Sequence, residues 1–540
     1  MPINPSRGRL WTSRARGRPV RPRPASNWQG SAAGSYLLCT PRQWGVAIIS
    51  GLIVSGLAWP AYASVSCWIG VVLLLMVVTV VHMVFTYRLV VCLPHIAILV
   101  SGLQYVLAAW LSFYYPATNP LFNIGQRLPE YLSYAGWVMT VVCLGWAFSF
   151  RGLSKSSILP APGSMRLLTE LDVLFWIGIT TKLLSRWVNL GPLNFVLLLC
   201  ADFRYLGALG RMLVSGRGWR WRLALTLALE MLLATGEGMF HSLLLWAAAS
   251  FVIYIYKTRP KRIVVAGIMC LGFLTLPALQ QAKVALRQSA LSGDSTQNPG
   301  SLGNAINVSK DVGGGMVKWA RGDWDSGALG DIAIRYNQGW IIDHVMQHVP
   351  AFEPYAKGGT LLAALEAAVM PRLIDSGKTQ AGGVANMSRY TGLVLAGTTS
   401  MNLGYAGEMY ANFGYWGGIA GCFFYALLLG LAFRWAFKRA VVHPLWWALV
   451  PYVGLIGLKA EDGIADVLNW LVKAALVGAA VYYTFPAIRA ALSTDRMWEL
   501  PRVSGNVRFS RQYQGRRRMN GVLGGRVAVA RARRVAPTRR

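Results

Sequence analysis

The constraint that most limits the fold is a series of long apolar runs, interrupted once by a polar segment at residues 281–410. Of the 540 residues, 54% are hydrophobic and only 14% are charged, which soluble domains rarely combine. About 20 apolar residues are enough to cross the hydrocarbon core of a bilayer. The chain is therefore expected to be an all-α polytopic integral membrane protein.

The apolar runs predict about twelve transmembrane helices and one large external loop. The predicted helices are 44–60, 65–86, 89–113, 131–150, 169–187, 192–210, 223–236, 238–256, 263–280, 411–433, 442–458 and 464–486. They divide the chain into a tail (1–43), helices one to nine (44–280), a large loop (281–410), helices ten to twelve (411–486) and a second tail (487–540).

Basic residues predict the orientation of these helices, because Lys and Arg mark short cytoplasmic loops. The basic clusters each follow an even-numbered helix: Arg88, Arg151/Lys155/Arg166, Arg211/Arg217/Arg220/Arg222, Lys257/Arg259/Lys261/Arg262 and Arg434/Lys438/Arg439. We therefore expect both termini to be cytoplasmic and the large loop to lie on the opposite face of the membrane.

The two tails account for much of the formal net charge of +32. Residues 1–43 hold eight Arg and no acid, and residues 487–540 hold fourteen Arg and two acids. Their Pro, Gly and Arg content predicts disorder. They show neither zinc-ligand spacing nor interleaved aromatic residues, so we expect contact with anionic lipid headgroups rather than with nucleic acid.

The loop at 281–410 contains none of the seven cysteines, so no disulfide can hold it. We expect it to be ordered by packing onto the membrane helices. Two helical segments are predicted in it, at about 329–349 and at 361–370, each followed by a proline.

An ordered set of motifs in the loop carries a family resemblance. The motifs are Arg335-Tyr336-Asn337, Pro354-Tyr355 with Gly358-Gly359, Pro371-Arg372 with Lys378, Ser400, and the box Gly407-Glu408-x-Tyr410-x-Asn412-Phe413-Gly414. In this order they resemble those of the Wzy-type oligosaccharide repeat-unit polymerases, the O-antigen and exopolysaccharide polymerase family. Lys378 precedes Thr379, where that family often shows Lys-Pro.

The resemblance implies a GT-C-like membrane glycosyltransferase without a cofactor, in a bacterial inner membrane with the large loop in the periplasm. Its substrates would be oligosaccharides linked to undecaprenyl pyrophosphate. Further partners would be membrane lipids and a chain-length regulator and flippase of the same pathway.

By the same resemblance, pyrophosphate would be stabilised by Arg335 and Arg372, and Glu408 would be the general base. Arg389, Lys378, Tyr410 and Asn412 are further substrate-binding candidates.

Each of these candidates also has a structural explanation. The arginines could form surface ion pairs with neighbouring carboxylates, which contribute little. Glu408 could favour a helix N-terminus through the helix dipole. Asn412, Phe413 and the glycines of the box could serve close helix packing instead of substrate binding.

Two basic pairs near the predicted outer helix ends, Lys182/Arg186 and Lys283/Arg287, are candidates for binding lipid phosphate. Alternatively, Glu230 and Glu237 could be their buried partners. A further candidate is Lys459, which lies with Glu461 and Asp462 in the last predicted external turn.

Two short patterns could bind a metal ion, Asp323-Trp324-Asp325 and Asp343-His344 with His348. Such short patterns are common by chance, and we expect no metal site.

Two other functions stay open. An O-antigen ligase would carry a histidine near the loop arginines, for which His344 or His348 is available. A transporter or flippase of lipid-linked glycans would usually show internal repeats, and none is visible.

Overall fold

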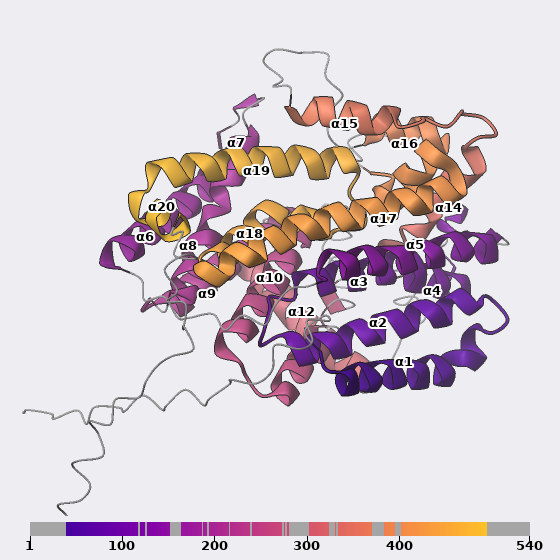
Figure 1. The fold of residues 1–540 in the computed structure, drawn as a ribbon, viewed down its shortest axis with the longest axis horizontal. Helices are drawn as coiled ribbons and strands as arrows, with labels where there is room; N and C mark the ends of the chain where they lie inside the picture. The colour runs from indigo at the N-terminus through magenta and orange to yellow at the C-terminus, as the bar shows by residue number, and fades with distance from the viewer. Residues whose placement is uncertain are drawn as a thin grey trace, which may run out of the picture.

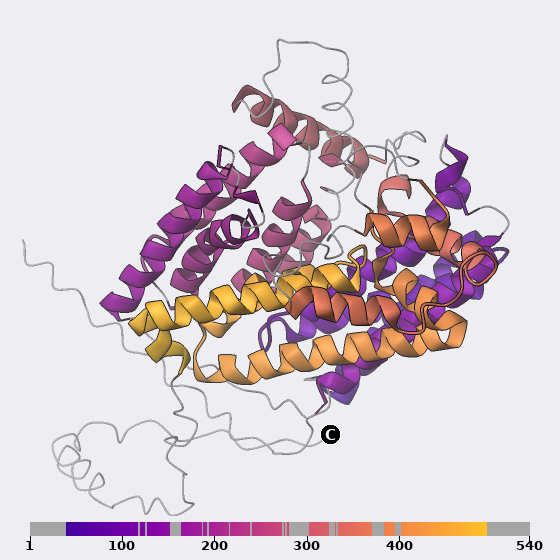
Figure 2. The same cartoon turned by 90° about the horizontal axis from the view of Figure 1, so that it is seen from above.

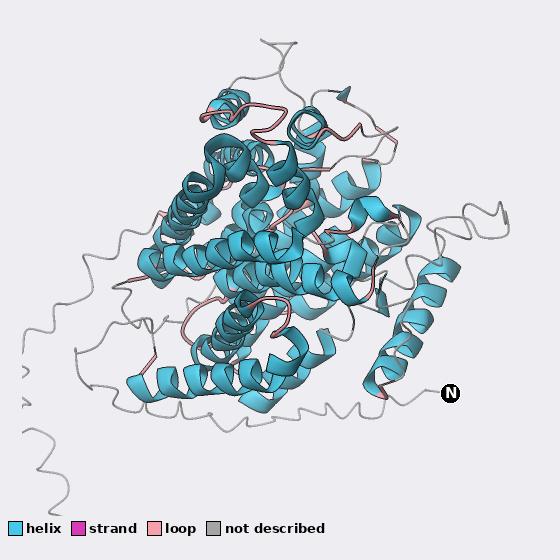
Figure 3. Cartoon of the chain, turned by 90° about the vertical axis from the view of Figure 1, so that its right-hand side faces the viewer, coloured by secondary structure: helices cyan, strands magenta, loops and turns pink. Residues whose placement is uncertain are grey.

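The computed structural model describes most of the helical part of the chain. The described residues are 39–116, 119–124, 127–151, 164–185, 187–188, 190–191, 194–214, 216–237, 240–272, 275, 278–279, 302–322, 330, 333–369, 383–394 and 401–493. Within these ranges every regular element is a helix (Figure 3). Residues 1–38 and 494–540 lie outside the described ranges. The predicted site residues Arg186, Lys283, Arg287, Arg372 and Lys378 also lie outside them.

The chain begins with helices that match the predicted ranges closely. The N-terminal group is α1 (Pro41–Tyr62), α2 (Cys67–Thr86), α3 (Leu93–Gly102), the π-helix η1 (Leu103–Leu107), α4 (Ala108–Tyr114), the 3-10 turn η2 (Pro120–Phe122) and α5 (Leu128–Ser149). A central group follows with α6 (Met165–Leu184), α7 (Asn194–Ala201), α8 (Phe203–Leu213), α9 (Trp219–Glu237) and α10 (His241–Thr258).

The polar segment and the C-terminal part are also helical. Between residues 281 and 410 lie α12 (Leu302–Ala320), α14 (Gly339–His348), α15 (Gly359–Val369) and α16 (Val384–Thr391). After them come α17 (Gly404–Val442), α18 (Trp446–Gly454), the 3-10 turn η5 (Leu455–Leu458), α19 (Ile464–Thr484) and α20 (Pro486–Leu492).

Six helical stretches are long and apolar enough to cross a membrane by length and composition. They are Pro41–Tyr62, Cys67–Thr86, Leu93–Tyr114, Leu128–Ser149, Gly404–Ala440 and Ile464–Thr484. Only 11% of the apolar window of α1 is buried within the protein, and Leu57 is 79% exposed. An apolar helix with so much outward surface suits a lipid environment. The predicted class of helical membrane protein is confirmed.

Capping residues explain where several of these helices begin. The Oγ1 of Thr40 accepts a hydrogen bond from the N–H of Gln43, whose side chain accepts from the N–H of Thr40. This reciprocal arrangement satisfies two backbone donors at the start of α1. Ser66 and Ser164 cap α2 and α6 with their hydroxyl oxygens in a similar way.

The helices pack in pairs that bring distant parts of the chain together. Helix α17 lies along α5, α1 along α2, α6 along α8, and α15 along α19 (Figures 1 and 2). Helix α14, which belongs to the polar segment, packs against α17 and α5, and α16 packs against α14. The described part of the polar segment is therefore ordered by the membrane helices, as predicted.

Two membrane helices depart from regular α geometry. Helix α3 continues into α4 through the π-helix η1, and the carbonyl oxygen of Gln104 within it accepts a hydrogen bond from the N–H of Gln338. A π turn changes the usual i→i−4 pairing, and such turns are frequent at functional sites. Here the π turn gives the polar segment a backbone attachment point on a membrane helix.

Helix α17 differs from the prediction at its start. It begins at Gly404 and not near residue 411, so the predicted box lies inside the helix. The helix is broken at Gly414, which has φ 70° and ψ −162°. A Cβ atom at this position would meet the ring and hydroxyl of Tyr355 at 3.0 Å. Glycine is required both for the backbone conformation and for this close approach.

We expect Gly414→Ala to lower the stability of the protein by about 1–3 kcal/mol, because alanine is strained at this φ and collides with Tyr355. The matched control is Gly478→Ala in α19, where a Cβ atom meets nothing within 4 Å. The thermal unfolding midpoint in detergent measures both variants. Equal midpoints for Gly414→Ala and the wild type would contradict the structural role of the break.

Candidate functional site

The carboxylate of Glu408 joins two membrane helices. Its side chain lies inside the protein, and Glu408 is only 3% exposed. The Oε2 atom accepts a hydrogen bond of 2.8 Å from the backbone N–H of Ile464, the first residue of α19. A negative charge at a helix N-terminus is favourable. Glu408 therefore does lie at a helix N-terminus, but at that of α19 and not of its own helix.

Asn412 attaches the segment 355–360 to α17. Its Nδ2 donates to the Thr360 hydroxyl at 2.7 Å and to the Glu408 carbonyl oxygen at 2.8 Å, and its Oδ1 accepts from the N–H of Gly358 at 3.0 Å. The backbone N–H groups of Ala356 and Lys357 donate to the carbonyls of Ala411 and Asn412. The side-chain amide of Asn412 thus makes three hydrogen bonds within the protein, which agrees with the structural explanation for this residue.

Tyr410 is also inside the protein. It is buried, and its ring meets the ring of Tyr134 edge to face at 5.2 Å between centroids. The box residues Glu408, Tyr410 and Asn412 are therefore brought together as a joint between α5, α17, α19 and segment 355–360. We call this set of contacts the box joint.

A second group of polar side chains surrounds Glu461, in the turn between η5 and α19. Its Oε1 lies 3.2 Å from Nδ1 of His241, the first residue of α10. Its Oε2 accepts hydrogen bonds of 3.5 Å from the amide groups of Gln104 and Gln338. Glu461 is 20% exposed at its side chain. We call Glu461, His241, Gln104 and Gln338 the Glu461 cluster.

Arg335 belongs to the surroundings of this cluster. It is exposed on the short helical turn at residues 333–336. Burial raises the pKa of the neighbouring Tyr336 hydroxyl to about 12, while the charge of Arg335 lowers it and that of Glu461 raises it. The cluster holds a carboxylate and an imidazole, and Arg335 is an exposed guanidinium on the segment that carries Gln338. Groups of these kinds can accept a proton and bind an anion.

The turn that carries Glu461 is tied to the membrane helices. The Tyr105 hydroxyl of η1 donates to the carbonyl oxygen of Ala460. Lys459 lies 3.2 Å from Asp462, and Asn402 donates to Asp466 at 2.8 Å. Since Glu408 holds Ile464 immediately after this turn, the box joint and the Tyr105 contact together fix the position of Glu461.

Asp462 is charged less readily than an ordinary aspartate. Burial raises the pKa of its carboxyl to about 6, against the opposing effect of Lys459. Asp462 faces Lys459, and the charges of Glu461 in the same turn and of Asp466 in the first turn of α19 raise its pKa further. Like charges at short range favour protonation of one of them.

Arg389 lies on α16 and takes part in a surface pair. Its Nε donates to Glu353 Oε1 at 2.6 Å, and its side chain is 61% exposed. The alternative explanation, a surface ion pair, therefore applies to Arg389, with Glu353 as the partner. The described residues do not bring Arg389 to the Glu461 cluster.

Lys182 lies in a buried charge network between α6, α8 and α9. Its Nζ is 3.8 Å from Glu230 Oε2, and the same carboxylate accepts a hydrogen bond from Arg204. Arg204 is also 3.6 Å from Asp202. The alternative that Glu230 is a buried partner of such a cation is confirmed. The two positive and two negative charges are balanced, as buried charges generally are.

The two predicted metal patterns have different outcomes. Asp323 and Asp325 lie outside the described residues. His344 interacts through Nδ1 with the Trp340 carbonyl oxygen, and His348 stacks on Phe352. Among the described side chains, no group of three or more His, Cys, Asp or Glu is placed to hold a metal ion.

Sequence reasoning missed His241, Gln104 and Gln338. Each is a single polar residue in or beside an apolar run, and they lie far apart in the chain. The only signal was the charged turn at 459–462, which contains Glu461. Their convergence depends on the π turn in α3 and on the packing of α14 against it.

No known family model matches this sequence, and no curated protein or solved structure is significantly similar to it. The fold and the side-chain geometry therefore define a class, a helical membrane protein with a polar cluster at the end of its helices.

The raised pKa of Asp462 predicts a pH dependence of stability. The usual pKa is 3.8, and a rise to about 6 corresponds to about 3 kcal/mol. The folded state binds the proton more tightly than the unfolded chain. Stability should therefore fall as the pH rises from about 4 to about 6, and Asp462→Asn should remove this part of the fall. Thermal unfolding midpoints of the wild type and of Asp462→Asn, measured from pH 4 to pH 7, test this. A difference between the two midpoints that does not change with pH would contradict the raised pKa of Asp462.

Proposed function

We propose that this protein is a bacterial inner-membrane glycosyltransferase that polymerises oligosaccharide repeat units carried on undecaprenyl pyrophosphate. The product would be O-antigen or exopolysaccharide. The observation that carries the proposal is the Glu461 cluster, in which Glu461 lies 3.2 Å from His241 and accepts hydrogen bonds from two glutamine amides. Arg335, an exposed guanidinium, lies three residues before Gln338 of this cluster. The order of motifs from Arg335 to Gly414 supports the same family.

The proposal includes twelve spans, with both termini in the cytoplasm and residues 281–410 in the periplasm. The alternation of basic clusters with helices supports this topology. Lipid-linked repeat units would then be joined on the periplasmic face. A flippase and a chain-length regulator of the same pathway would be partners, and no cofactor is required.

The proposed reaction is a glycosyl transfer between two lipid-linked glycans. A hydroxyl oxygen of the acceptor sugar forms a bond to the anomeric carbon of the donor glycan. The bond from that carbon to the pyrophosphate oxygen breaks, and undecaprenyl pyrophosphate leaves with its electron pair. The acceptor hydroxyl proton passes to a carboxylate. Guanidinium groups stabilise the negative charge on the leaving group.

We propose a different distribution of these roles from the one that the sequence suggested. Glu461 is a partly exposed carboxylate beside His241, so it suits the general base. Glu408 is buried and bonded to Ile464, so it suits positioning of the turn that carries Glu461. Arg335 suits the pyrophosphate contact, and Arg372 keeps the same role as a proposal from the motif order.

A second candidate is an O-antigen ligase, which transfers glycan to a lipid core. The observation in its favour is a histidine in the Glu461 cluster, His241 at 3.2 Å from Glu461, whereas the cluster contains neither His344 nor His348. Deleting the gene and sizing the surface glycan separates the two functions. Single repeat units attached to the cell support the polymerase, and full-length chains left on carrier lipid support the ligase.

We expect Arg335→Ala and Arg372→Ala to reproduce the deletion phenotype, with polymer reduced about a hundredfold or more at normal protein level. Arg389→Ala is the matched control, because its guanidinium is already paired with Glu353 at the surface. It should leave the chain length nearly unchanged. Normal chain lengths in both the Arg335 and Arg372 variants would rule out the proposed pyrophosphate contact.

A further inference from the structure

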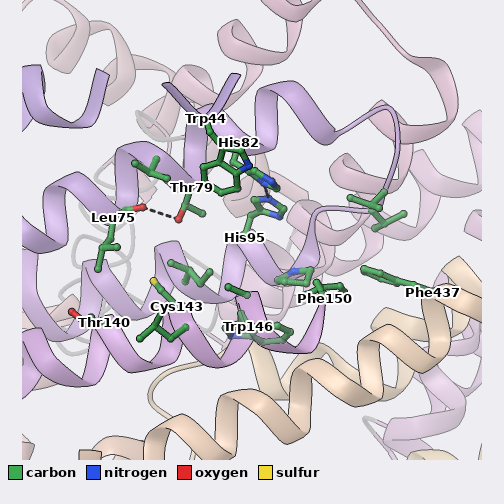
Figure 4. Close-up of a pocket in the computed structure, with 17 residues that line it drawn as sticks. Trp44, Leu75, Thr79, His82, His95, Thr140, Cys143, Trp146, Phe150 and Phe437 are labelled. Atoms are coloured by element: carbon green, nitrogen blue, oxygen red, sulfur yellow. Dashed lines mark hydrogen bonds between the residues drawn. The ribbon is translucent and has the colours of Figure 1, made fainter. Parts of the chain in front are cut away.

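A cavity of about 280 Å³ is lined by residues of α1, α2, α3, α5 and α17 (Figure 4), and none of these residues belongs to the Glu461 cluster. Its walls are mainly apolar and include Leu75, Val78, Ile98, Leu144 and Phe437. The volume is near the lower end of small-molecule sites, which are roughly 300–1,000 Å³. The cavity therefore has room for part of an extended apolar chain.

The cavity borders the surface that faces lipid. Leu144, which lines it, is 46% exposed, and Phe148 one turn further along α5 is also exposed. Both α2 and α5 are long and apolar enough to span the membrane. An apolar void has no partner atoms on one side and loses dispersion contacts, which a hydrocarbon chain from the bilayer would restore.

One end of the cavity is polar. Nδ1 of His82 and Nε2 of His95 lie 2.7 Å apart, and the two rings stack at 5.0 Å between centroids. Figure 4 shows this pair beside Trp44 of α1. Since an apolar chain gains little by leaving lipid for an apolar pocket, selective binding must depend on polar contacts at this end.

Cations surround the same part of the protein. Four exposed basic residues lie one or two positions along the chain from residues that line the cavity. They are Arg42 (near Trp44), Arg88 (near Val90), Arg151 (next to Phe150) and Lys438 (next to Phe437). They come from four different segments. The sequence has no Asp or Glu between residues 39 and 116. The local charge is therefore positive, which is complementary to an anionic headgroup.

We propose that this cavity holds an acyl chain of an anionic phospholipid, with its headgroup at Arg42, Arg88, Arg151 and Lys438. The site does not depend on the proposed glycosyl transfer, because it shares no residue with the Glu461 cluster. A lipid held there fills the space between α1 and α5.

The test uses the full-length protein in vesicles containing a phosphatidylglycerol with a photoreactive diazirine in its acyl chain. Peptides from α2 and α5 should be labelled about fivefold more than with phosphatidylcholine carrying the same chain. Cys143→Trp fills the cavity from its wall and should reduce this labelling to background. Cys67→Trp is the matched control, since Cys67 is exposed at the start of α2 and does not line the cavity.

A second variant keeps the test decisive if Cys143→Trp fails to fold. The double change Arg88→Gln and Arg151→Gln alters only exposed side chains and should lower phosphatidylglycerol labelling to the phosphatidylcholine level. Equal labelling by the two lipids in the wild type would overturn the assignment of an anionic lipid. Labelling of α2 and α5 that persists in a folded Cys143→Trp protein would overturn the cavity as the site.

Discussion

The hydrogen bond from the Ile464 N–H to the Glu408 carboxylate is the contact on which the candidate site depends. It is 2.8 Å long, and it lies in the interior, where an unpaired carboxylate would be costly. It fixes the first residue of α19 against α17. The turn immediately before that residue carries Glu461, so a buried hydrogen bond sets the position of a partly exposed carboxylate.

The helical class and many helix positions could be predicted from the sequence, because apolar runs of about 20 residues are typical of membrane-spanning helices. The run from Leu93 to Tyr114 is one continuous stretch, as predicted, although a π turn interrupts it. The start of α17 could not be predicted by hydropathy. Its first residues carry Glu408 and Asn412, which hydrogen-bond to α19 and to segment 355–360 and therefore resemble loop residues in the sequence.

The candidate site was only partly predictable for a related reason. Arg335 and the turn containing Glu461 were recognisable as charged residues in polar stretches. His241, Gln104 and Gln338 were not, because their proximity to Glu461 is a property of helix packing. The same holds for Lys182. Its spacing suggested lipid phosphate, whereas the packing of α6 against α8 and α9 brings Glu230 and Arg204 to it.

The most direct measurement of the central claim is chain extension by the purified protein in vesicles supplied with an undecaprenyl-pyrophosphate-linked oligosaccharide. The wild type should form products that grow by whole repeat units and should release undecaprenyl pyrophosphate. Glu461→Gln should stop extension while keeping the wild-type thermal midpoint, and Glu408→Gln should lower the midpoint. Undiminished extension by Glu461→Gln, or no extension by the wild type, would contradict the account.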